Sequence, residues 1–123
     1  MSDIQAIVGD FLPSSTTQIT GQLVDANGNP VGSNVLTSLT LTITAPLLPG
    51  APFVNSVNKV NILNTGRGTI DVNGNLTIQL LPADMTVLGT ADEVHYLIIE
   101  GQYSSNKQVT AVLEIVVRYI VGV

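Results

Sequence analysis

Catalytic chemistry has few candidate residues in this chain, because the sequence contains a single histidine and no cysteine. The histidine, His95, lies within a run of alternating residues typical of a β-strand, and no nucleophile motif accompanies it. A catalytic base must be oriented against a nucleophile, so we interpret His95 as a packed residue with Glu93 or Tyr96 as a structural hydrogen-bond partner. The sequence therefore predicts that the protein is not an enzyme.

Pairs of carboxylates are the second candidate, since two carboxyl groups can together hydrolyse a glycosidic bond. Asp92 and Glu93 are a poor pair, because adjacent side chains of a strand point to opposite faces. Glu100 and Glu114 are expected to approach each other across the last hairpin. However, the chain has no tryptophan and only 4% aromatic residues, so we expect no platform on which a sugar could stack. We interpret these carboxylates as solvated or interfacial charges.

A calcium site is the third candidate, because the motif D-x-N-G-N occurs twice, at residues 25–29 and 71–75. Alternating Asp and Asn oxygens open a calcium-binding loop, but such a loop also needs a glutamate at its twelfth position. Leu36 and Pro82 occupy that position here. Both copies are also good turn sequences without a metal. The sequence therefore predicts turns at these segments, and neither a metal nor a cofactor.

The composition indicates one domain of 123 residues with an aliphatic core. Apolar residues make up 45% of the chain, whereas charged residues make up only 11%, against about a quarter in a typical soluble protein. The polar surface must therefore consist mainly of Asn, Thr, Ser and Gln. Such a surface suits a chain that packs among copies or partners, so we expect a homo-oligomer.

Charge and hydropathy argue against two classes of partner. The net charge is −5 and the four basic residues are scattered, so we expect no surface that follows nucleic-acid phosphates. No stretch approaches the length of a membrane span, so we expect no membrane contact. The segment Met1-Ser2-Asp3 is acidic where a secretory signal would be basic, which predicts synthesis and folding in the cytoplasm.

The segment from Gly68 to Met85 gives the clearest structural signal. Alternating residues on both sides of Asn73-Gly74 predict two strands joined by a two-residue turn in which both residues have positive φ. Pro82 begins a predicted single helical turn. About seven strands with regular turn signals indicate an all-β antiparallel sandwich, with a small closed barrel as the alternative. The other strands are predicted at residues 18–24, 36–44, 60–63, 93–103 and 108–121.

Two segments outside this pattern are predicted to contact partners. Residues 1–17 are an N-terminal arm and connector, either extended or a short helix, before the sandwich domain of residues 18–123. Residues 45–58 are a proline-rich loop that either packs on its own domain or inserts into a partner. The predicted partner contacts are Ile4, Ile7, Phe11, Leu12, Leu47, Leu48, Phe53 and Val54.

The last two predicted strands contain apolar residues on both faces, most clearly at Ile115-Val116-Val117. A strand that is apolar on both faces is generally covered on both faces. In so small a domain, we expect the second cover to come from another chain.

The order of these motifs resembles a family of small immunoglobulin-like β-sandwich proteins that tailed bacteriophages encode among their head and neck genes. The matching positions include the Asn61–Asn64 segment, the Gly74–Asp84 hairpin, and Glu93, His95, Tyr103 and Lys107 in the last two strands. The resemblance covers about residues 20–117, in the four pieces TGQLVDANGNPV, LTSLTLTI, VNKVNILNTGRGTIDVNGNLTIQLLPADM and EVHYLIIEGQYSSNKQVTAVLEIVV.

The resemblance implies an antiparallel immunoglobulin-like sandwich that is a structural protein of the virion and has no catalytic residues. We accordingly expect oligomeric packing in the neck or tail connector region, against portal, connector, capsid or tail subunits, by a protein made in the host cytoplasm. Capsid decoration is the first alternative. A module that recognises host receptors or glycans is the second, but it predicts exposed aromatic residues in loops, and this chain has few.

Overall fold

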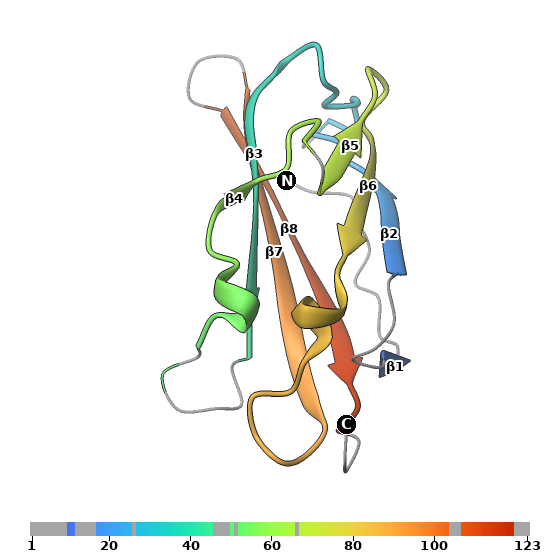
Figure 1. The fold of residues 1–123 in the computed structure, drawn as a ribbon. Helices are drawn as coiled ribbons and strands as arrows, with labels where there is room; N and C mark the ends of the chain where they lie inside the picture. Colours follow the sequence, from blue (N-terminus) through green and yellow to red (C-terminus); the bar gives the residue numbers. More distant parts are fainter. Residues whose placement is uncertain are drawn as a thin grey trace.

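The computed structural model describes residues 10–11, 17–25, 27–45, 50, 52–65, 67–103 and 107–119, which form two packed β-sheets (Figure 1). The larger sheet has the strand order β1-β8-β7-β3-β4, and the smaller sheet has the order β2-β6-β5. Neighbouring strands are antiparallel except β1, which runs parallel to β8. The elements are β1 (Asp10–Phe11), β2 (Thr17–Gln22), β3 (Leu36–Thr44), η1 (Val54–Ser56), β4 (Val60–Asn61), β5 (Gly68–Ile70), β6 (Asn75–Leu80), η2 (Pro82–Met85), β7 (Glu93–Tyr103) and β8 (Lys107–Val117).

The predicted all-β fold is confirmed, and alternation of side chains explains the two layers. In β3 the aliphatic residues Leu39, Leu41 and Ile43 are fully buried, while the threonines between them project to the other face. The strands β6, β7 and β8 alternate in the same way. The inward side chains of both sheets therefore meet in one aliphatic core.

Most strand bounds agree with the sequence. The strands predicted at 36–44 and 93–103 are present at those residues, whereas the first and last predicted strands are β2 (Thr17–Gln22) and β8 (Lys107–Val117). The helical turn predicted at Pro82 is also present, as the 3-10 helix η2. Pro82 suits that position because the first residue of a helix has no intrahelical use for its N–H group.

The hairpin between β5 and β6 has a different turn from the one predicted. Gly74 has a φ of 80°, but Asn73 does not have positive φ. The Gly74 N–H donates to the Asp71 carbonyl at 3.2 Å, which closes a four-residue turn. The left-handed glycine then forms a bulge, so the hairpin has a three-residue loop. The predicted two-residue turn with positive φ at both residues is therefore wrong.

The two D-x-N-G-N segments form the same turn. In each, an Oδ1 of the first aspartate, Asp25 or Asp71, accepts the N–H groups of the residues two and four positions later, at 2.9 to 3.0 Å. A hydrogen bond from the Asn29 N–H lowers the pKa of Asp25, and one from the Asn75 side chain lowers that of Asp71. These oxygens, which suggested a calcium loop, are engaged in closing the turns.

The turn at residues 71–75 also contacts the residues that flank the 25–29 turn, through main-chain atoms. The Leu23 N–H donates to the Gly74 carbonyl at 2.9 Å, and the Ser33 N–H donates to the Asp71 carbonyl at 3.0 Å. A Cβ atom at Gly74 would stand 2.6 Å from the Leu23 carbonyl oxygen. Close approach of two chains, as well as positive φ, therefore requires glycine at this position.

The predicted N-terminal arm is described only in part. Asp10 and Phe11 are extended and pair, as β1, with Val116 and Val117 of the same chain. These two residues therefore form a strand on their own domain. The remaining residues of the predicted arm, including Ile4, Ile7 and Leu12, lie outside the described residues.

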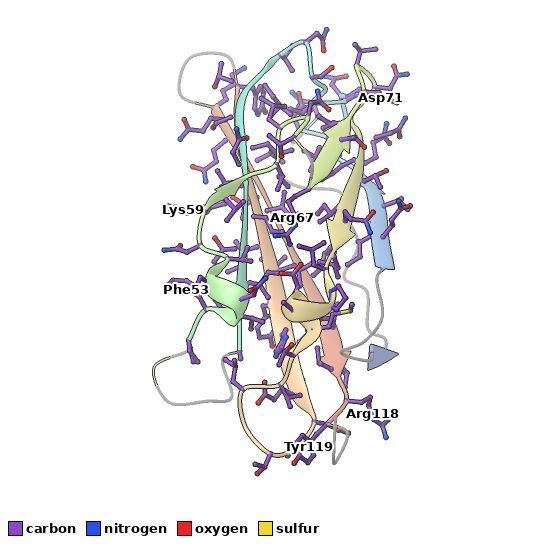
Figure 2. The ribbon with its side chains drawn as sticks, viewed as in Figure 1. Phe53, Lys59, Arg67, Asp71, Arg118 and Tyr119 are labelled. Carbon is purple, nitrogen blue, oxygen red and sulfur yellow. The ribbon has the colours of Figure 1, made fainter. Side chains whose placement is uncertain are left out.

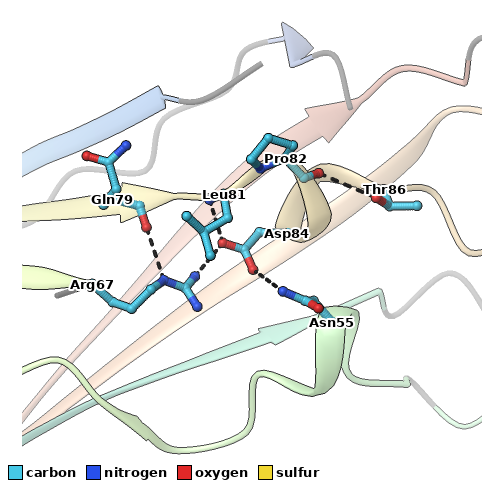
Figure 3. A network of polar contacts seen from close by, with 7 residues as sticks. All are labelled: Asn55, Arg67, Gln79, Leu81, Pro82, Asp84 and Thr86. Carbon is cyan, nitrogen blue, oxygen red and sulfur yellow. Dashed lines mark hydrogen bonds and ion pairs between the residues drawn. The ribbon is translucent and has the colours of Figure 1, made fainter. Parts of the chain in front are cut away.

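A buried carboxylate, Asp84, joins three segments of the chain, at Asn55, Arg67 and residues 81–84 (Figure 3). Its Oδ2 accepts the Leu81 N–H at 2.8 Å and pairs with Arg67 Nη2, and its Oδ1 accepts the Asn55 side-chain N–H at 3.0 Å. The Arg67 Nε also donates to the Gln79 carbonyl at 3.3 Å. We call this group the Asp84 clamp, because it holds η1 and η2 to the strands of the smaller sheet.

Glu93 and His95 form a second buried polar group at the start of β7. Glu93 Oε1 pairs with His95 Nε2 and accepts the Leu88 N–H, each at 2.9 Å, and Oε2 accepts the Gly89 N–H at 2.5 Å. Burial by itself raises the pKa of Glu93, but the hydrogen bonds from His95, Leu88 and Gly89 outweigh it and lower the pKa below its usual value. The structural hydrogen bond predicted between His95 and Glu93 is therefore confirmed.

Candidate partner interface

The outer face of the larger sheet carries a group of apolar side chains, and the described part of the chain forms no third layer over it (Figure 1). On this face Val94 lies opposite Val116, and Ile98 lies opposite Val112. Val112 is 47% exposed and the other three are half-buried. An uncovered apolar group on a sheet is typical of a surface that packs against a partner. We call Val94, Tyr96, Ile98, Val112 and Val116 the outer patch.

The outer patch is continuous with Phe53 at the sheet edge. Phe53 bridges to Thr44, which pairs with Tyr96, and Tyr96 pairs with Glu114 on β8. Paired residues of adjacent strands project to the same face, so Phe53 stands in one row with Tyr96. Its side chain is 47% exposed beside η1 (Figure 2). Within this row, a hydrogen bond to the Glu114 carboxylate raises the pKa of the Tyr96 hydroxyl.

Polar and charged groups border the outer patch at both ends. At one end Lys59 Nζ lies 4.0 Å from Glu100 Oε1, beside a shallow polar hollow. At the other end Arg118 Nε lies 3.1 Å from Asp92 Oδ2 (Figure 2). An apolar centre with a polar rim is the usual arrangement of a protein–protein interface. The hollow is lined by Ser38, Thr40, Lys59, Glu100, Gln102 and Gln108.

The predicted partner contacts have different outcomes. Phe53 is exposed on the outer face, as an interface residue must be. Val54 has 0% exposure, because the bridge beside it turns its side chain into the core, so its placement on a partner-facing surface is corrected. Phe11 is described as a strand residue without its side chain. The others, Ile4, Ile7, Leu12, Leu47 and Leu48, lie outside the described residues.

Sequence reasoning did not assign the outer patch itself as a site. The signal was present, since the strands that became β7 and β8 are apolar on both faces. The pattern indicates that a second cover is needed, but it does not show which of the two faces meets the core. The pairing with β3 decides this, because it places Leu97 and Ile99 inside and leaves Ile98 outside.

The described residues offer no clear site for catalysis or metal binding. His95 and Glu93 are buried with each other, and His95 is therefore shielded from a substrate. Among the described residues no group of three or more His, Cys, Asp or Glu side chains could hold a metal ion. In the same part of the chain, no helix is long and apolar enough to cross a membrane.

Comparison of the chain with protein-family models gives no match, and comparison with curated proteins gives no significant match.

Proposed function

We propose that this protein is a structural component of a tailed-phage virion, which acts by packing its outer patch against a second copy or another virion protein. The observation that carries the proposal is the uncovered apolar group on β7 and β8, with Phe53 beside it. The low charge of the chain, 11%, agrees with a surface that is shared with neighbours. The neck or tail connector is the region we favour.

The strand order supports an immunoglobulin-like interpretation of the fold. The smaller sheet, β2-β6-β5, has the order of the B, E and D strands of an immunoglobulin domain, and β8-β7-β3 has the order of G, F and C. The short strand β4 then corresponds to C′, which variable-type domains add to that sheet. This order agrees with the phage sandwich proteins that the sequence resembles, although fold alone does not determine function.

A single substitution in the outer patch tests this proposal. Val112→Glu places a charge at the most exposed position of the outer patch, on a strand face where it does not disturb the core. Because burial of a valine side chain contributes about 1.5–3 kcal/mol, we expect self-association to weaken by about tenfold or more. The measurement is molar mass against concentration, by size-exclusion chromatography with light scattering.

Val72→Glu is the matched control, since Val72 is 60% exposed and lies on the β5–β6 turn, away from the outer patch. It should leave association unchanged, and both variants should unfold at the concentration of denaturant that unfolds the parent. A wild-type chain that is monomeric but binds assembled capsid, with Val112→Glu abolishing the binding, would favour capsid decoration instead. A monomer that binds no virion protein contradicts the proposal.

A further inference from the structure

Paired residues of β7 and β8 divide the outer patch into rows that run across both strands. Side chains at paired positions project to the same face of a sheet. The rows, in order along the strands, are Val94–Val116, Tyr96–Glu114 and Ile98–Val112. Asp92 and Arg118, joined at 3.1 Å and both exposed, form an end row beside the first of these (Figure 2). Each row therefore contains one residue from β7 and one from β8.

The two members of each row are chemically suited to contact each other. Two of the rows place one aliphatic side chain beside another. In the row between them, the Tyr96 hydroxyl donates to the Glu114 carboxylate. In the end row, the Arg118 guanidinium pairs with the Asp92 carboxylate. Such a surface also fits its own copy when β7 of one copy lies over β8 of the other, because each row then meets the same row with its members exchanged.

A two-fold axis that lies midway between β7 and β8, parallel to both strands, relates two copies in this way. Both copies then use the same surface, as is usual in a two-fold dimer. The strands of the two sheets also keep similar directions, as face-to-face sheets do when they pack about 30° apart. Because of that angle, the rows match most closely in the middle of the outer patch, whereas the end row relies on the length of the arginine side chain.

A two-fold axis across the strands fits the outer patch less well. Centred on the Tyr96–Glu114 row, it would bring the Glu114 carboxylates of the two copies together, and like charges that meet at an interface are costly. Glu114 lies between apolar rows, so its carboxylate needs a hydrogen-bond donor when association removes water. The axis parallel to the strands instead brings the Tyr96 hydroxyl of the second copy beside this carboxylate.

We propose that the outer patch binds a second copy of this chain, related by a two-fold axis parallel to β7 and β8, with β7 of each copy over β8 of the other. This inference rests on the proposed function, since it names the partner of that same surface. Asp92 of one copy then lies near Arg118 of the other, and both side chains keep their contact within their own chain. This complementarity of charge, and not apolar area alone, favours a second copy over an unrelated protein.

A mixture of two charge variants tests this arrangement. Arg118→Glu makes the end row entirely acidic, and Asp92→Arg makes it entirely basic. Because two like-charged rows face each other in either variant alone, we expect self-association to weaken by about tenfold or more. An equimolar mixture should form a heterodimer as tightly as the parent dimerises, as measured by light scattering and native mass spectrometry. The matched control mixes Val72→Glu with Val72→Arg, at an exposed site away from the outer patch, and should leave the association of the parent unchanged.

Cysteines test the same arrangement without a change of charge. Val94→Cys and Val116→Cys each introduce a single thiol, because the chain has no cysteine. Facing residues of two packed sheets can form a disulfide, as in immunoglobulin domains. Position 94 faces position 116 of the second copy, so only a mixture of the two variants should give a reducible, disulfide-linked dimer on electrophoresis. A mixture of either variant with Val72→Cys is the matched control and should stay unlinked.

Three results would overturn this inference. They are a parent chain that stays monomeric, a mixture of charge variants that associates no more tightly than each variant alone, and a cysteine variant that links with itself as readily as in the mixture. Each leaves the proposed function intact if Val112→Glu still abolishes binding of the chain to another virion protein. A parent dimer whose association Val112→Glu leaves unchanged would contradict the proposed function as well.

Discussion

The Asp84 clamp and the Glu93–His95 pair each supply hydrogen bonds to a buried carboxylate, but from different donors. Each is a buried carboxylate that accepts three hydrogen bonds, and each ties a loop to the sandwich. Asp84 faces the guanidinium group of Arg67, which suits paired contact with a carboxylate. Glu93 faces a histidine whose Nδ1 is buried and has no hydrogen-bond partner in the described structure.

This difference indicates that the two groups contribute differently to the free energy of unfolding and to its dependence on pH. The Asp84 carboxylate pairs with a guanidinium group, and its bonds connect η1, η2 and the smaller sheet. The Glu93 carboxylate depends on hydrogen bonds from the loop before β7 and from the His95 ring. We therefore expect the Asp84 clamp to dominate the free energy of unfolding at neutral pH, and the Glu93–His95 pair to control its dependence on acid.

The largest expected effect is that of Asp84→Ala. Removal of the carboxylate leaves the Arg67 charge with only 20% of its side chain exposed and without its partner, and such a loss costs about 3–5 kcal/mol. Urea unfolding followed by circular dichroism measures the change. Asp92→Ala is the matched control, because it removes an exposed carboxylate that pairs with Arg118 and accepts the Tyr119 N–H, and it should cost about 1 kcal/mol. Equal costs for the two variants would show that the Asp84 clamp is unimportant.

The next effect is the response to acid. In the folded protein the pKa of Glu93 lies below the ordinary glutamate value of 4.5. The ionised carboxylate therefore contributes its full stabilisation of the folded state above about pH 4.5, and this stabilisation is lost as the pH falls through the lower folded-state pKa. Glu93→Gln should lower stability at pH 7 by about 1–3 kcal/mol and flatten the decline below pH 4.5. Thermal unfolding at a series of pH values measures both. A variant as acid-sensitive as the parent would assign the acid response to other carboxylates.

The smallest effect separates hydrogen bonding from charge within the Asp84 clamp. Asn55 has a φ of 55°, so Asn55→Gly keeps a favourable backbone while it removes the bond to Asp84. The loss of one hydrogen bond to a carboxylate at a partly exposed site should cost about 1 kcal/mol. Asn55→Ala should cost more, since alanine is strained at positive φ. If Asn55→Gly lowers the free energy of unfolding as much as Asp84→Ala does, the hydrogen bond from Asn55, and not the ion pair with Arg67, provides most of the stabilisation by the Asp84 clamp.

The sequence predicts the strands well because alternation is a local property. The residues of β3 show this, since Leu39, Leu41 and Ile43 are buried wherever the strand packs. The turn at Asn73-Gly74 was predicted less well, because contacts from Leu23 and Ser33, distant in the sequence, help to determine its shape. Val54 was misplaced for a similar reason, since the bridge between Phe53 and Thr44 decides which neighbour faces the core.

The candidate interface was predictable only in outline. Two-faced alternation in β7 and β8 indicated a missing cover, and Phe53, one of the predicted partner contacts, is 47% exposed. The identity of the uncovered face follows from the order of strands in the sheet, which depends on pairings across the whole chain. The half-buried Arg67 and the buried Asp84 are 17 residues apart in the sequence, so no local pattern predicts their ion pair.

The contact of the 71–75 turn with Leu23 and Ser33 has a consequence for how this protein can vary. Main-chain atoms hold that end together, whereas Val72, at the tip of one turn, is 60% exposed. Side chains at the tip are therefore replaceable, but an added residue would displace the carbonyls of Asp71 and Gly74 from their donors. In evolution or in the laboratory, this end should accept new residue types readily and new loop lengths poorly, which makes it a place to display a substituted epitope and not an inserted one.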